Sequence, residues 1–136
     1  MVEVPVDKEM QKKALAYRML DSRLKDMLQQ RELIAEKILE IQTTLLGIDE
    51  VMKSQGDVLF SLGSEAHVQG SVKGKSLIVE IGAGVALEKN VDEAKSILAK
   101  RMKDLESAIS SIQNEMEKTS FAMSEIESQL EAEGVE

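Results

Sequence analysis

The stretch that decides the fold is residues 57–90, DVLFSLGSEAHVQGSVKGKSLIVEIGAGVALEKN. Apolar residues follow a spacing of two in four short runs: Val58, Phe60 and Leu62; Ala66, Val68 and Val72; Leu77, Val79 and Ile81; Val85 and Leu87. This period is typical of strands with one buried face. The runs are separated by the turn-forming sequences Gly63-Ser64, Lys73-Gly74-Lys75 and Gly82-Ala83-Gly84. We therefore predict two β-hairpins within residues 57–89.

A long helix is predicted before this stretch, over residues 7–55, with Asp7 as a suitable N-cap. Its heptad seam has Met10, Tyr17, Leu24, Arg31, Ile38, Leu45 and Met52 at a and Lys13, Leu20, Met27, Ile34, Ile41 and Ile48 at d. Only two of these positions, Lys13 and Arg31, are charged, which is typical of a coiled coil. Gly56 is expected to end the helix as its C′ residue.

A second long helix is predicted after the stretch, over residues 90–133, and Gly134 is expected to mark its end. Asn90 and Glu93 have the spacing of a capping box at its start. The seam has Met102, Ile109, Met116, Met123 and Leu130 at a and Leu98, Leu105, Ile112, Thr119 and Ile126 at d. Two helices of similar length can bury such seams on each other. The sequence therefore predicts an α+β chain in one unit, 1–136, in which a long antiparallel coiled-coil hairpin carries two inserted β-hairpins.

Composition excludes several classes of function. The net charge of −8 argues against nucleic-acid binding, and no apolar run is long enough to span a membrane. There is no cysteine for a disulfide, and His67 is the only histidine, so we expect no metal site. Residues 70–76, GSVKGKS, lack the glycine spacing of a phosphate-binding loop and precede a strand rather than a helix. We expect no cofactor and no enzymatic activity, in a soluble cytoplasmic protein.

The predicted geometry leaves apolar surface without a partner at both ends of the helices. The strands have one apolar face and open edges, and the helices are expected to run away from them, so the strands should pair with other chains. The residues expected to mediate this oligomerisation are Val58, Phe60, Leu62, Val68, Val72, Leu77, Val79, Ile81, Val85 and Leu87. At the far end, Leu15, Met19 and Phe121 occupy heptad positions that a two-helix coil leaves exposed to solvent.

The chain resembles the archaeal prefoldin alpha subunit family, through DVLFSLGSEAHVQGSV and LIVEIGAGVALEK in the hairpins and GAGVALEKNVDEA leading into the second helix. The resemblance covers nearly the whole chain. It implies a hexamer of two alpha and four beta subunits, with the strands in an intersubunit β-barrel. It also implies an ATP-independent chaperone that holds unfolded polypeptides at the coiled-coil tips and delivers them to a group II chaperonin. An ordinary alpha subunit and a paralogue that self-assembles into filaments both fit the resemblance.

Apolar residues near the free ends of the two helices are the candidates for contact with unfolded clients. They are Val2, Val4, Val6, Met10, Leu15, Met19, Phe121, Met123, Leu130 and Val135. Flexible Met side chains suit such a role because they adapt to unrelated sequences. The alternative function is a structural coiled-coil scaffold, or a filament-forming prefoldin-like protein, that does not bind clients.

Overall fold

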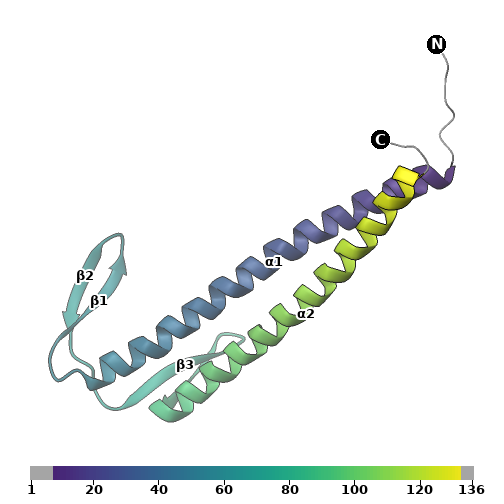
Figure 1. The fold of residues 1–136 in the computed structure, drawn as a ribbon. Helices are drawn as coiled ribbons and strands as arrows, with labels where there is room; N and C mark the ends of the chain where they lie inside the picture. Colours follow the sequence, from purple (N-terminus) through teal and green to yellow (C-terminus); the bar gives the residue numbers. More distant parts are fainter. Residues whose placement is uncertain (1–7, 133–136) are drawn as a thin grey trace. The chain divides into compact units, whose positions relative to one another are not determined.

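The computed structural model describes residues 8–132 and confirms two long helices with two antiparallel hairpins between them (Figure 1). The elements are α1 (Lys8–Lys53), β1 (Val58–Gly63), β2 (Ala66–Gly70), β3 (Ser76–Gly82), β4 (Val85–Asn90) and α2 (Val91–Ala132). The predicted N-cap Asp7 and the predicted helix end at Gly134 lie outside the described residues. None of the helices within residues 8–132 has an apolar stretch long enough to cross a membrane.

The described chain divides into two compact units. Residues 8–36 and 106–132 form what we call the terminal unit, in which the first part of α1 lies beside the last part of α2. Residues 37–105 form the hairpin unit, which contains the end of α1, the four strands and the start of α2.

The heptad seam predicted for both helices is confirmed by burial. Every a and d position from Met10 to Leu130 is buried or half-buried, whereas Leu15, Met19 and Phe121, at outer positions, are exposed. The most buried seam residues in the terminal unit are Met27 (7%), Thr119 (5%) and Met123 (8%). Side chains spaced at 3.5 residues fall on one stripe of a helix, so each helix buries one stripe on the other.

The two helices of the terminal unit are antiparallel. Arg23 and Met27 line a groove together with Ile112 and Glu115, whereas Leu28 and Arg31, further along α1, line one with Ile109 and Gln113. Increasing numbers on α1 therefore meet decreasing numbers on α2. An ion pair of 3.5 Å between Arg23 Nη2 and Glu115 Oε2 joins the two helices.

At the helix ends next to the strands, the sequence prediction is wrong for α1 and confirmed for α2. α1 ends at Lys53, and Gly56 does not adopt the left-handed conformation of a C′ residue, so its predicted role is wrong. Instead the Ser54 hydroxyl donates a hydrogen bond of 3.1 Å to the Gly56 carbonyl. The capping arrangement of α2 is confirmed: Asn90 Oδ1 accepts a bond of 2.8 Å from the Glu93 backbone N–H, and Asn90 Nδ2 donates one of 2.9 Å to Glu93 Oε1.

The two hairpins repeat the same turn geometry. In the first, Gly63, Ser64 and Glu65 have φ values of +94°, +48° and +66°, and in the second Gly82-Ala83-Gly84 has +111°, +53° and +75°. Both ladders shift register immediately before this turn, between Ser61 and Gly63 in one and between Glu80 and Gly82 in the other. Two central residues with positive φ match the right-handed twist of the paired strands. The two hairpins therefore share one turn geometry.

The second hairpin contacts the helix that follows it. The ribbon of β3 lies beside the first part of α2 (Figure 1). The Arg101 guanidinium of α2 donates a hydrogen bond to the Glu80 carbonyl of β3. Val79 on β3 is 8% exposed, and its neighbour Leu77 is half-buried. The prediction that the helices run away from the strands is therefore wrong for this hairpin, because the chain itself covers part of it.

Candidate functional site

The first hairpin presents an apolar face that the described chain leaves uncovered. Phe60 on β1 and Val68 on β2 are cross-strand partners, so their side chains share one face. Phe60 is 40% exposed, Val68 47% and Leu62 69%. A Cβ added at Gly70 would lie 3.0 Å from Phe60 Cε2, so the aromatic ring rests against the glycine backbone. A face of this kind is suited to contact with another chain.

The second hairpin also has exposed apolar residues. Ile81, Val85 and Leu87 are exposed near its turn, whereas Val79 is buried within the chain. Of the other residues predicted to mediate oligomerisation, Val72 is exposed and Val58 and Leu77 are half-buried. Val79 therefore has less exposed surface to offer another chain than Ile81, Val85 and Leu87, and its place in a core shared between chains stays a prediction.

Two exposed aliphatic residues of the hairpins were missed by sequence reasoning. Leu59 is 66% exposed and pairs with Gln69, and Ile78 is 78% exposed and pairs with Glu88. Both lie on the face that alternation assigned to polar residues, because they interrupt the spacing of two. The signal that could have revealed Leu59 and Ile78 was a large apolar residue at a position where the spacing of two expects a polar one.

The terminal unit places the predicted client-contact residues in different environments. Leu15, Met19 and Phe121 are 56%, 65% and 66% exposed, and Met10 and Leu130 are half-buried seam residues. Met123 is only 8% exposed because it lies in the seam, and its contact with clients stays a prediction. The predicted contacts of Val2, Val4, Val6 and Val135 lie outside the described residues.

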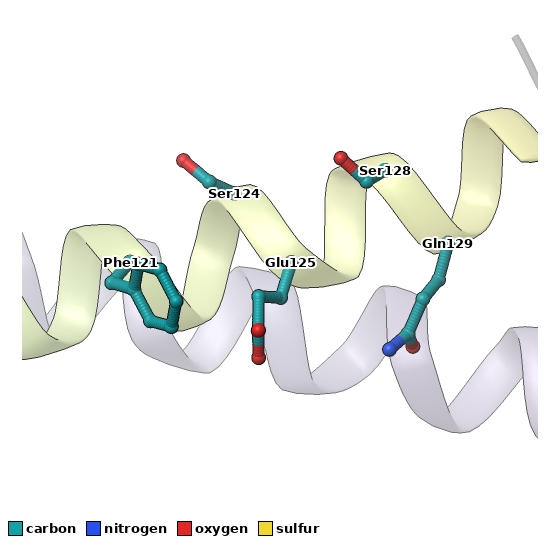
Figure 2. A pocket seen from close by; sticks show the side chains of 5 residues that line it. All are labelled: Phe121, Ser124, Glu125, Ser128 and Gln129. Carbon is teal, nitrogen blue, oxygen red and sulfur yellow. The ribbon is translucent and has the colours of Figure 1, made fainter.

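Phe121 opens a shallow groove on the outer surface of α2 (Figure 2). The groove has a volume of about 420 Å³ and is lined by Phe121, Ser124, Glu125, Ser128 and Gln129. These residues recur three or four positions apart, so they occupy one face of the helix. Figure 2 shows Phe121, Glu125 and Gln129 following one another along it. The sequence reasoning found Phe121 and missed the rest, although helical spacing from Phe121 would have located them.

Exposed leucines also lie elsewhere on α1, away from the predicted surfaces. Leu33, Leu39 and Leu46 are 65%, 63% and 67% exposed and occupy outer heptad positions. They match Leu15, Met19 and Phe121 in exposure but not in location along the chain. They therefore serve as an internal control for any function assigned to exposed apolar surface.

One ion pair joins the two helices within the hairpin unit. Lys95 on α2 donates a hydrogen bond to the Asp49 carboxylate on α1. This bond, helped by the charges of Lys95 and Lys53, lowers the pKa of Asp49 below its ordinary value. Elsewhere in residues 8–132, no three His, Asp or Glu side chains gather closely enough to hold a metal ion.

These features define a class of protein in which a two-helix coiled-coil hairpin carries β-hairpins with open apolar faces. The family model described as Prefoldin subunit matches residues 20–136. The chain therefore belongs to the prefoldin family, which is a family of chaperones.

Individual relatives agree with this assignment. Prefoldin subunit alpha of Pyrococcus horikoshii is 30% identical over 128 residues, which cover 91% of this chain and 82% of that protein. Prefoldin subunit alpha of Methanobrevibacter smithii is 28% identical over 109 residues, covering 78% and 75%. The cryo-EM structure of filamentous PFD from Methanocaldococcus jannaschii has the same fold, with a TM-score of 0.77 at 15% identity over 85% of this chain and 98% of that one. The chain is thus a prefoldin chaperone subunit, and its homology to named subunits implies an oligomeric complex.

Proposed function

We propose that this chain acts in an ATP-independent holdase of the cytoplasm. Unfolded polypeptides bind the terminal unit at the exposed residues Leu15, Met19 and Phe121, and the complex transfers them to a group II chaperonin. The hairpins join the chain to beta-type subunits through an intersubunit β-barrel, in a hexamer of two alpha and four beta subunits. Prefoldin membership supports the chaperone role, and the uncovered face around Phe60 and Val68 supports assembly through strands.

The observation that carries the client-binding role is the exposure of Leu15, Met19 and Phe121 on helices whose seam is already filled. Because α1 and α2 satisfy each other along the seam, these side chains contribute nothing to that packing. Small apolar patches on separate helical arms bind weakly one at a time, and several arms in one assembly raise the effective concentration around one client. Net negative charge keeps such arms from aggregating with each other.

The experiment compares two sets of three apolar residues with similar exposed fractions, 56–66% in one set and 63–67% in the other. Leu15→Ser, Met19→Ser and Phe121→Ser together should abolish most suppression of aggregation of a chemically denatured protein. Leu33→Ser, Leu39→Ser and Leu46→Ser together should leave suppression intact. Both triple variants should keep the mass of the assembly by light scattering, because none of these residues belongs to the hairpins. Full protection by the first triple variant would contradict the proposed client surface.

A structural scaffold is the second candidate, favoured by the fold shared with a filamentous assembly and by the open hairpin faces. Aggregation suppression separates the two candidates, because a pure scaffold has no reason to protect a denatured protein. A wild-type assembly that forms filaments and gives no protection would establish the scaffold.

A further inference from the structure

The terminal unit carries two exposed apolar patches whose charged neighbours have opposite sign. On α2, Phe121 has Glu117 four residues before it and Glu125 four residues after it. On α1, Leu15 has Lys12 three residues before it and Arg18 three residues after it. Residues three and four apart on a helix are neighbours on its surface, with Cβ atoms about 5–6 Å apart. Each patch is therefore an apolar side chain held between two like charges.

The charges around Phe121 are available to a ligand. Glu117 and Glu125 are exposed and make no ion pair within residues 8–132. Lys118, three residues before Phe121, has its ammonium group 3.7 Å from Glu115, so this cation is paired with a different carboxylate. Within residues 8–132, no basic side chain therefore forms an ion pair with either carboxylate, and Arg31 is the basic residue that lines a groove together with Glu117.

The contrast between the patches extends along each helix. Between Glu115 and Glu131 the charged residues are five glutamates and one lysine, whereas between Lys8 and Arg31 they are seven basic and three acidic residues. The acidic surface also contains the groove that Phe121, Glu125 and Gln129 line (Figure 2). An apolar side chain that enters this groove would bring its own neighbours in sequence beside the carboxylates.

We propose that the Phe121 face binds unfolded segments in which an apolar side chain has lysine or arginine close by in sequence. Close by means within one helical turn of a helical segment or within two residues of an extended one. This inference rests on the proposed client-binding function and names the class of client segment that this face selects. Apolar contact with Phe121 supplies attraction that is independent of charge. Glu117 and Glu125 favour basic neighbours and disfavour acidic ones, since like charges at close range repel.

The test uses the full chain in its assembled form and two fluorescent peptides with the same apolar residues. One peptide has lysines beside each apolar residue, and the other has glutamates at the same places. Fluorescence anisotropy should show tighter binding of the lysine peptide to the wild type. Glu117→Gln with Glu125→Gln should weaken that binding roughly three- to ten-fold, the effect of removing two exposed charge pairs. Phe121→Ser should weaken it as well.

The matched control is Glu50→Gln with Glu65→Gln, which makes the same charge change at exposed positions of the hairpin unit. This control should leave both peptides unaffected. Equal loss of lysine-peptide binding in the control would assign the preference to net charge and overturn the proposal. The proposal would also be overturned if a lysine peptide without apolar residues bound as tightly as the lysine peptide that has them.

Two other outcomes separate this inference from the function on which it rests. If both apolar peptides bind equally well and Glu117→Gln with Glu125→Gln has no effect, client binding stands and charge selection is wrong. If neither peptide binds, the proposed client-binding function itself is contradicted.

Light scattering of the wild type and of Glu117→Gln with Glu125→Gln tests a different occupant. A mass that rises with protein concentration in the wild type and not in this double variant would assign the Phe121 face to the basic α1 patch of a second copy, and would also overturn the proposal.

Discussion

Replacing Val68 with aspartate should dissolve the assembly while leaving the chain folded. Val68 is 47% exposed on the uncovered face of the first hairpin, opposite Phe60. Within one chain, a carboxylate at this position stays hydrated and costs little. In an assembly that buries this face, the same carboxylate lies among apolar side chains of another subunit.

The magnitude follows from the exposed fractions. Complete burial of a valine, leucine or phenylalanine side chain is worth about 1.5–3 kcal/mol. Val68, Leu62 and Phe60 keep 47%, 69% and 40% of their surface in the chain, so covering all three by a partner contributes about 4 kcal/mol per hairpin. Val68→Asp removes about 1 kcal/mol of this and adds several kcal/mol for an unpaired buried carboxyl. The sum weakens association by at least about a thousand-fold.

Size-exclusion chromatography with light scattering measures the result, and far-UV circular dichroism tests whether both helices remain. The matched control is Gln69→Asp, which introduces the same charge at the next residue on the opposite face. Val79→Asp is less informative, since Val79 is buried within its own chain and its substitution would disrupt the hairpin directly. An unchanged mass for Val68→Asp would refute assembly through this face.

Three further substitutions test the seam, the turns and the ion pair. Ile109→Asp should lower the free energy of unfolding by about 2–4 kcal/mol in thermal melts, because Ile109 lies in the seam. Phe121→Ala should change the free energy of unfolding by less than about 0.5 kcal/mol in the same melts, because Phe121 is exposed. Equal effects of the two substitutions would show the heptad register to be wrong. Gly82→Ala should destabilise the chain by about 1–2 kcal/mol in urea titrations, because Gly82 has a φ of +111°. Gly56→Ala should not destabilise it, because Gly56 lies outside the left-handed region and has open space around it. Similar values for the two variants would contradict the turn geometry. The pKa of Asp49 is lowered by Lys95, so their pair stabilises the fold above the ordinary aspartate value of 3.8 and loses this contribution as pH falls through the lower folded-state pKa. Lys95→Met should therefore reduce stability at neutral pH and flatten its dependence on pH in that acid range, and an unaltered profile would show that the pair does not contribute.

The seam could be predicted from sequence because its signal is local and repeated. Each heptad of α1 gives the same information, so the charged residue Arg31 does not obscure the pattern, and the partner helix comes from the same chain. The cap at Asn90 was also predictable, because its partner Glu93 is three residues away. Both features depend on contacts that neighbouring residues determine.

Features that depend on distant residues were not predictable in the same way. The burial of Val79 accompanies a contact between the hairpin and α2, shown by the bond from Arg101 to Glu80, and no spacing in β3 indicates it. Met123 was predicted as a client contact from its place near the free end of α2, although its heptad position also assigned it to the seam, where it is 8% exposed. The low exposure of Met123 was therefore foreseeable from its heptad position, whereas the contact between β3 and α2 was not foreseeable from the strand pattern.

The exposed apolar residues of the two units differ in the backbone that carries them, and this difference would affect how long a contact with a partner lasts. In α2 every internal backbone N–H and C=O is bonded along the helix, so Phe121 can offer a partner only its side chain and those of its neighbours. In the first hairpin each strand pairs on one side only, so an incoming strand gains backbone hydrogen bonds together with contact to Phe60 and Val68. A helix face that binds through side chains alone releases its ligand readily, whereas a strand edge that adds a ladder of bonds holds it. The two units therefore have similar fractions of exposed apolar surface but suit different contacts. The hairpin unit suits a stable subunit interface, and the terminal unit suits a transient client contact.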